Sequence, residues 1–411
     1  MSRAMILFED SHWSDLRPLT DLMPVQALVF GASDLATRWR GAIGMPLRAL
    51  VGRGDAMATW NPAPIEANRS EEAVLINAAA LPGAWLAKAI EGPAPALWLA
   101  DGRVVGGRLP MSQLEPAILR GEGFEIWLRS LGLPTVPVEA PLLRWPWDLV
   151  AENARAIAAD LDGRSGVVDG TVHASAVLLE SGRITVAAGA RIDPLAVLDA
   201  REGPIRIGEG AVVLSHTVVQ GPCVVGAGTQ LLGGFVGHSS IGPGCRIAGE
   251  VDHCVWQGWA NKRHHGFVGH SVVGEWVNLG ALTTTSDLKN NYGEVQVRMG
   301  GREIATGSHK VGSILGPHVK TGIGTLLPTG AVVGTGANLF GGGRFAPKEV
   351  PSFGWWDGQT MVEHELERFL ATARVAVSRR GRALSPADER LLRSLHAATA
   401  RERGAVAGGR P

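Results

Sequence analysis

The side chains with the most evident chemistry in this sequence lie together between Asn261 and Glu294. This stretch, NKRHHGFVGHSVVGEWVNLGALTTTSDLKNNYGE, holds two adjacent histidines, two of the six lysines and the only tyrosine. An imidazole titrates near neutral pH, so His264 could take a proton from an amine as that amine attacks a carbonyl. A lysine ammonium suits a phosphate as a point charge, which makes Lys262 and Lys289 candidate phosphate ligands.

Each of these residues also has an ordinary structural interpretation. A single loop histidine is more often solvent-facing than catalytic, and loop lysines are commonly just solvated. The cluster is more specific because further polar side chains occur nearby, at Asn278, Asn291 and Tyr292. Several polar groups converging in one place are typical of a ligand pocket. The sequence therefore predicts a polar pocket in which His264 acts as a general base.

A six-residue repeat surrounds the cluster and must position it. An aliphatic residue followed by glycine opens the hexads IGEGAV, VGAGTQ, IGPGCR, VGEWVN and VGTGAN. The fifth position is small or β-branched, so Cys223 and Cys245 occupy slots that we expect to be buried. One hexad cannot bury its apolar face alone, whereas stacked hexads can. The pattern resembles the signature of the left-handed parallel β-helix, which we predict over residues 163–350.

The hexad rhythm breaks between His253 and Phe267, and again between Asp287 and Lys310. Irregular insertions in a rigid solenoid are where function is usually carried. The reactive cluster lies at these two insertions.

The flanking sequences predict three further parts. Residues 1–147 combine apolar runs of strand length with helical patterns, which indicates an α/β domain with a helix over 32–43 that begins at the N-cap Ser33. Residues 148–162 read as a linker helix. Residues 351–411 predict a helical hairpin and a tail, and the second helix is expected to open at the N-cap Ser385 with proline at its first position.

The composition excludes several functional classes. The formal net charge is zero, so no global field favours nucleic acid or an anionic membrane. No signal-peptide pattern and no run of eighteen apolar residues occur, from which we expect a cytoplasmic protein. Three cysteines without paired spacing argue against a disulfide framework and a thiolate zinc site. Nine arginines against three acids from residue 374 onward indicate a solvated helix face or, alternatively, an anion- or partner-binding patch.

The stretch NKRHHGFVGHSVVGEWVNLGALTTTSDLKNNYGEV resembles the acetyltransferase half of the GlmU family. These are bifunctional N-acetylglucosamine-1-phosphate uridyltransferases and glucosamine-1-phosphate N-acetyltransferases. The closer resemblance is to an alternative GlmU-like group with a short, divergent N-terminal domain, carried more weakly by LRPLTDLMPVQALVFGASDLATRW. The resemblance implies acetyl-coenzyme A-dependent N-acetylation of an amino-sugar phosphate, in nucleotide-sugar synthesis of the UDP-N-acetylglucosamine type. It also implies a homotrimer with the site in a cleft between adjacent solenoids.

Individual roles follow from the resemblance. His264 falls where the family has its general base, and Asn278 matches the asparagine that lines the sugar site. Ala281 and Ser313 match positions that contact acetyl-coenzyme A.

The resemblance also implies how a sugar phosphate is held. Phe267 stands where ordinary GlmU proteins have a tyrosine, so a hydroxyl that could touch the phosphate is absent. Phosphate recognition would then depend more on Lys262 and Lys289. The pair Asn291 and Tyr292 resembles the Asn-Tyr pair that lies beyond the family's site.

The N-terminal domain departs further from the family. GlmU nucleotidyltransferases begin with a glycine-rich loop of the type LAAGxGTRM, where this chain has ILFEDSHWSD. Met23-Pro24 and Arg38-Trp39 stand where the alternative group has Arg-Pro and Lys-Trp pairs, and Ala79 replaces an expected arginine. Since cationic phosphate ligands are lost, we expect a weakened UTP-dependent sugar-1-phosphate nucleotidyltransferase that uses Mg²⁺ if it is active.

Two alternatives belong to other functional classes. The chain could be a non-catalytic trimeric scaffold that binds a nucleotide sugar. It could also be a zinc enzyme of the carbonic anhydrase type built from hexapeptide repeats, with His253, His264, His265 and His270 supplying imidazoles across a subunit interface. The spacing of these histidines does not match a metal-ligand motif, so no residue is predicted to bind a metal.

Overall fold

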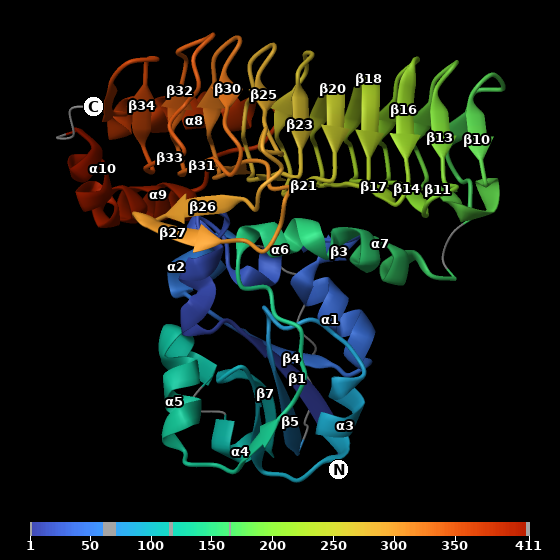
Figure 1. The fold of residues 1–411 in the computed structure, drawn as a ribbon. Helices are drawn as coiled ribbons and strands as arrows, with labels where there is room; N and C mark the ends of the chain where they lie inside the picture. Colours follow the sequence, from blue (N-terminus) through green and yellow to red (C-terminus); the bar gives the residue numbers. More distant parts are fainter. Residues whose placement is uncertain (1, 61–70, 115–117, 164–165, 408–411) are drawn as a thin grey trace. The chain divides into compact units, whose positions relative to one another are not determined.

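The computed structural model describes residues 2–60, 71–114, 118–163 and 166–407 (Figure 1). The chain forms two compact units. The first comprises Met1–Leu28 and Ser33–Trp145, and the second comprises Val29–Ala32 and Pro146–Pro411.

The first unit is built on a six-stranded mixed sheet in the order β4-β1-β5-β7-β6-β8. Helices α4 and α5 pack on one face of this sheet, and α1 and α3 on the other (Figure 1). Its strands are β1 (Arg3–Phe8), β3 (Ser33–Asp34), β4 (Leu47–Val51), β5 (Glu72–Asn77), β6 (Ala96–Ala100), β7 (Arg103–Pro110) and β8 (Thr135–Pro137). Its helices are α1 (Leu35–Ile43), α2 (Gly54–Thr59), α3 (Trp85–Glu91), α4 (Met111–Leu114) and α5 (Phe124–Ser130).

The start of α1 corrects one expectation from the sequence. Asp34, and not Ser33, is the N-cap, because its carboxylate accepts the Thr37 amide at 2.6 Å. The Ser33 hydroxyl instead donates to the carbonyl of Asp34 at 3.2 Å. An aspartate and a serine cap a helix about equally well, so two such neighbours leave the choice to the local backbone.

The second unit is a parallel β-solenoid whose coils have three faces, which we name the first, second and third face (Figure 1). The first face holds β11 (Ile184–Val186), β14 (Ile205–Ile207), β17 (Cys223–Val225), β19 (Ser240–Ile241), β21 (Val255–Trp256), β24 (Val272–Val273), β28 (Ile314–Leu315), β31 (Val332–Val333) and β33 (Glu349–Val350). The second holds β9 (Thr171–Val172), β12 (Arg191–Ile192), β15 (Val212–Val213), β22 (Asn261–Lys262), β29 (Lys320–Thr321), β32 (Asn338–Leu339) and β34 (Gly354–Trp356). The third holds β10 (Val177–Leu179), β13 (Val197–Asp199), β16 (Thr217–Gln220), β23 (Phe267–Gly269), β25 (Thr284–Thr285) and β30 (Leu326–Leu327).

Two long strands, β18 (Gln230–Gly237) and β20 (Arg246–Asp252), continue from the second face onto the third. Four further strands lie outside the three faces. They are β2 (Val29–Phe30), which pairs with β3, the hairpin of β26 (Gln296–Met299) and β27 (Arg302–Ala305), and β35 (Met361–Glu363), which pairs with β34. Three flat faces of short strands are the geometry of the predicted β-helix. The predicted fold class, an α/β domain followed by a hexapeptide β-helix and C-terminal helices, is therefore confirmed.

The interior of the solenoid is a continuous apolar column of small and aliphatic side chains. Cys223 and Cys245 are fully buried in it, as the repeat predicts, and their burial raises the pKa of each thiol to about 12. These thiols are therefore neutral core groups.

Close stacking of coils makes certain glycines obligatory. A Cβ on Gly312 would lie 1.9 Å from the carbonyl oxygen of Gly269 and 2.3 Å from the Ser271 hydroxyl. We expect Gly312→Ala to force adjacent coils apart and to lower the melting temperature of the solenoid strongly, measured by circular dichroism. Gly182→Ala, where an added Cβ meets nothing within 4 Å, is the matched control and should melt like the wild type.

Helices precede and follow the solenoid. The expected linker helix is two helices, α6 (Pro146–Ala151) and α7 (Asn153–Leu161), separated at Glu152. At the other end lie α8 (Leu366–Ser378), α9 (Pro386–Ala398) and α10 (Ala400–Ala407). Ser385 is the N-cap of α9, as the sequence predicts, and it also forms a reciprocal capping box with Asp388. Among the described residues, no helix is both long and apolar enough to cross a membrane.

Candidate functional site

The first insertion places His264 on a bulge between the second and third faces. Strand β20 pairs with both β22 and β23. Two residues separate its paired positions Ile247 and Glu250, whereas four residues separate the matching positions Lys262 and Phe267. The two extra residues cannot follow the coil and loop outward, which exposes His264 to solvent.

Lys262 holds this bulge from beneath. Its side chain is 1% exposed, and its ammonium donates to the carbonyl oxygens of Ala248 at 2.8 Å and His264 at 2.9 Å. Burial lowers the pKa of Lys262 to about 8. The structure therefore places this predicted phosphate ligand inside the solenoid, where it fixes the backbone of His264.

A column of polar side chains runs along the second face beside His264. Register pairs Arg246 with Asn261, Asn261 with Asn278, and Asn278 with Lys320 on successive coils. Neighbouring strands lie about 4.8 Å apart, so these four side chains line up at that spacing. The Asn261 amide donates to the Asn278 amide oxygen at 2.8 Å.

A pocket of about 510 Å³ lies over this polar column, and its other wall is the second half of α8. His264 and Asn278 both line it, so the structure brings together the predicted base and the predicted sugar-site amide. The helix contributes Thr372, Val375 and Ala376.

The pocket is strongly cationic. Within the described part of the chain, five arginines and lysines line it, whereas no carboxylate does. They are Arg246, Arg263, Lys320, Arg379 and Arg380. Burial lowers the pKa of Lys320 to about 8, and burial together with neighbouring Arg246 and Arg379 lowers the pKa of Arg380. A cluster of like charges in which two cations have lowered pKa values is suited to binding an anion.

Two indoles form an aromatic wall of the same pocket. Trp259 and Trp276 stack with ring centroids 5.5 Å apart and planes 12° from parallel. The guanidinium of Arg382 lies 4.7 Å from the Trp259 ring centroid. Such flat apolar surfaces suit the ring of a nucleobase or a sugar.

The other predicted residues of the first insertion lie in a second pocket, of about 670 Å³. Phe267 and His265 line it together with Phe235, Glu250 and Asp252. This pocket belongs to the third face, so the adjacent histidines His264 and His265 serve different pockets.

The second insertion leaves the solenoid as the β26–β27 hairpin and returns at Lys310. Tyr292 is 71% exposed on it, and the Lys289 ammonium donates to the carbonyl of Glu294. The Asn291 side chain accepts the Gly293 amide at 3.1 Å. None of these three predicted sugar-phosphate ligands lines the His264 pocket, and their role stays a prediction.

The two predicted coenzyme A contacts differ in exposure. Ala281 is half-buried, and its carbonyl accepts the Gly324 amide at 2.8 Å. Ser313 is fully buried, its amide donates to the Ser271 hydroxyl, and its own hydroxyl has no hydrogen-bond partner among the described residues. These assignments also stay predictions.

Sequence reasoning missed the arginines and the lysine that surround His264. The excess of arginine near the chain's end was the available signal, but a solvated helix face explained it equally well. Only the packing of α8 on the second face brings Arg379 and Arg380 to residues more than one hundred positions earlier.

The first unit places acidic residues where strand β1 ends. Glu9 accepts from the Arg53 guanidinium at 2.8 Å, and Asp10 accepts from Arg103 at 2.7 Å and from Asn77 at 2.8 Å. All these side chains are buried. The two carboxylates are thus held by arginines of the same unit.

Comparisons with known proteins find a family model and several relatives that match parts of the chain. The family model described as sugar nucleotidyl transferase matches residues 5–165. A bifunctional sugar-1-phosphate nucleotidylyltransferase/acetyltransferase of Sulfurisphaera tokodaii is 36% identical over 93 residues, which are 23% of this chain and 23% of that protein. The bifunctional protein GlmU of Rippkaea orientalis is 27% identical over 161 residues, 37% of this chain and 34% of that protein. The matches thus span about a quarter to a third of the length of these relatives.

Solved structures also resemble the chain. The UDP-N-acetylglucosamine acyltransferase from Campylobacter jejuni is 14% identical, with a TM-score of 0.30. The similarity covers 55% of this chain and 83% of that one.

Proposed function

We propose that this chain, which its family match and curated relatives support as GlmU-like, transfers an acyl group from acyl-coenzyme A to an amino-sugar phosphate. The observation that carries the proposal is the single pocket shared by His264, Asn278 and a set of cations. A base, an amide and phosphate-binding groups are what an acceptor with an amine and a phosphate requires.

In the proposed reaction, His264 takes the proton of the sugar amine as its nitrogen attacks the thioester carbonyl. The new carbon–nitrogen bond forms, the carbon–sulfur bond breaks, and the thiolate of coenzyme A receives the proton from the imidazolium. The Asn278 amide orients the sugar, and the cations hold the phosphate. Acetyl-coenzyme A is the proposed donor.

The pocket cations predict a pH dependence. Burial lowers the pKa of Lys320 to about 8, so its ammonium is charged below that pH and becomes neutral above it. We expect the KM for the phosphorylated acceptor to rise as the pH passes through about 8, because an attractive charge is lost. Lys320→Arg should suppress this rise, since a guanidinium stays protonated. The measurement is KM against pH for both proteins, and an identical rise in the two would contradict the role of Lys320.

The first unit is proposed to transfer a nucleotidyl group to a sugar 1-phosphate, with UTP and Mg²⁺. The family match over residues 5–165 supports this second activity. The carboxylates of Glu9 and Asp10 are of the type that Mg²⁺ prefers, but the buried arginines already neutralise them. We therefore propose a weak activity, tested by pyrophosphate release from UTP with Mg²⁺ and with a chelator.

A homotrimer in the cytoplasm is the proposed setting. Leu282, Ile323 and Phe345 are 58%, 73% and 64% exposed. These three residues lie on adjacent coils, because backbone hydrogen bonds run from Gly324 to Ala281 and from Gly343 to Gly324. An exposed apolar row of this kind supports association with further copies, and the mass of the assembly in solution tests it.

The decisive experiment is a coenzyme A release assay with amino-sugar phosphates and nucleotide-linked amino sugars, each with and without UTP and Mg²⁺. Turnover that depends on the acceptor supports the proposal. Tight binding of a nucleotide sugar without turnover of any acceptor would instead favour the scaffold.

A further inference from the structure

The third face carries a ladder of histidines that the proposed acyl transfer does not use. His238, His253 and His270 follow strands on three successive coils, each with a backbone φ of 43–50°. The rings of His238 and His253 stack at 4.3 Å, and those of His253 and His270 at 4.7 Å. Stacking at the coil spacing therefore presents three imidazoles along one edge of the solenoid.

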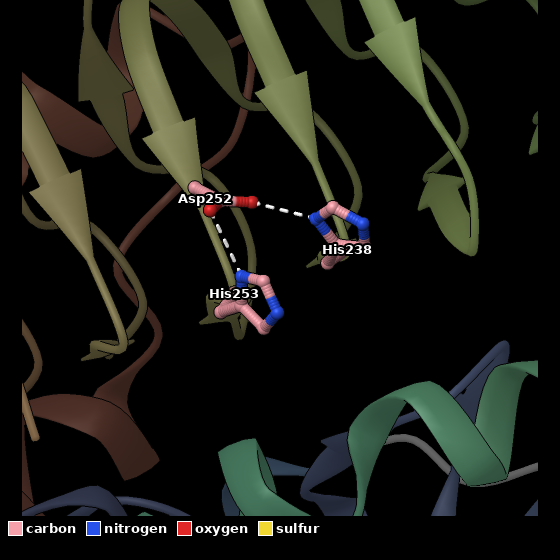
Figure 2. A group of neighbouring side chains, drawn as sticks. All are labelled: His238, Asp252 and His253. Carbon is pink, nitrogen blue, oxygen red and sulfur yellow. Dashed lines mark hydrogen bonds and ion pairs between the residues drawn. The ribbon is translucent and has the colours of Figure 1, made fainter. Parts of the chain in front are cut away.

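The carboxylate of Asp252 contacts the first two histidines, His238 and His253. Asp252 ends β20 and bridges the Nδ1 edges of the two rings, with Oδ1 2.8 Å from Nδ1 of His238 and Oδ2 2.9 Å from Nδ1 of His253 (Figure 2). The three ligand atoms lie within 4.8 Å of one another.

The contact with His253 is incomplete as a hydrogen bond. Nδ1 of His253 is shielded from solvent and, among the described residues, has no hydrogen-bond partner of good geometry, although Oδ2 is near. In the tautomer that carries its proton on Nε2, the Nδ1 lone pair and the carboxylate oxygen beside it are both available to a bound cation.

The surroundings have further features of a metal site. Nε2 of His238 lies 3.2 Å from a carboxylate oxygen of Glu202, and metal-binding histidines commonly give their other ring N–H to a carboxylate. Gly237 keeps the space for Asp252 open, since a Cβ there would lie 3.0 Å from Oδ1. The side chains are partly accessible, at 16% exposed for His238, 28% for Asp252 and 40% for His253.

We propose that His238, Asp252 and His253 bind one divalent transition-metal ion of the zinc type. Two imidazoles and a carboxylate are ligands that zinc accepts, and three protein ligands leave one position open. Zinc–nitrogen bonds of about 2.05 Å require ligand atoms roughly 3.3 Å apart, so the triad closes by small rotations of the imidazoles about their Cβ–Cγ bonds. Asp252 also lines the second pocket, so the site lies at the edge of a cavity large enough for a small molecule.

The test is zinc binding by the full chain after metal has been removed with a chelator. We expect one Zn²⁺ per chain in a competition titration, and a visible absorption band when Co²⁺ is bound instead. His238→Ala, His253→Ala and Asp252→Asn should each weaken Zn²⁺ binding by about 100-fold or more, and Glu202→Gln by about tenfold.

His270→Ala is the matched control. His270 stacks on His253, but its Nδ1 is bound to Asp287 at 2.7 Å, outside the triad. Its replacement should leave the Zn²⁺ affinity within about threefold. No stoichiometric Zn²⁺ uptake by the wild type, or an equal loss in His270→Ala, would overturn the proposal, provided that circular dichroism shows the variants folded. His264→Ala should keep full Zn²⁺ affinity, so this test is independent of the proposed acyl transfer.

Discussion

Replacing His264 by alanine should lower the rate of coenzyme A release with an amino-sugar phosphate by about 10²- to 10⁴-fold. The imidazole is the group in the cationic pocket that can accept a proton from the attacking amine near neutral pH. The arginines and Lys320 stay in place, so binding of the phosphorylated acceptor should change little. The loss should therefore appear in kcat, with KM nearly constant, as measured in steady-state assays.

The matched control for this prediction is His173→Ala. His173 is an exposed histidine of an early coil, and its Nδ1 lies 2.9 Å from the Ser175 hydroxyl. Its loss should leave kcat unchanged. Equal activity of the His264→Ala variant and the wild type would remove the proposed general base and leave the scaffold as the better interpretation.

Replacing Arg53 by methionine should destabilise the first unit by about 3–5 kcal/mol, as expected when one partner of a buried ion pair is removed. Arg53 donates to Glu9 at 2.8 Å and to the carbonyls of Thr20 at 2.8 Å and Met23 at 2.9 Å. Its guanidinium also lies 3.7 Å from the Trp13 ring centroid. Methionine fills part of the space but leaves a buried carboxylate without its cation.

Hydrogen exchange can measure this effect in the full chain, because amides of β1 and β5 report unfolding of the first unit apart from the solenoid. Arg374→Met is the matched control, since its ion pair with Glu389 lies at the surface. Exposed pairs contribute little, so this variant should exchange like the wild type. Unchanged hydrogen-exchange protection in the Arg53→Met protein would contradict the prediction. It would mean that the buried Glu9 carboxylate can lose its cation without a cost in stability.

Much of the architecture could be predicted because it is encoded locally. The hexad requires an aliphatic residue and a small inward residue at fixed spacing, so Cys223 and Cys245 could be assigned to the core before any coordinates. The N-cap of α9 could be found as easily, because Ser385 and the following Pro386 form a local signal. The resemblance to GlmU-like proteins is supported by the comparisons, which match a sugar nucleotidyl transferase model and bifunctional relatives.

Charged side chains were harder to place, because their burial depends on distant segments. Lys262 reads as an accessible phosphate ligand in sequence, but its ammonium turns inward to two carbonyls under the bulge. Arg103 likewise gives no sequence signal of its partner Asp10, which lies 93 residues away.

The amino-acid sequence by itself determined the solenoid, its two insertions and the candidate base, since periodicity and its interruption are properties of neighbouring residues. The tertiary structure alone decided which side chains meet. Stacking of coils aligns Asn278 with Lys320, packing of α8 brings Arg380 to His264, and one carboxylate on the third face joins two histidines of successive coils. These contacts depend on the register between coils and on the packing of a helix. Neither can be predicted from the sequence of a single coil.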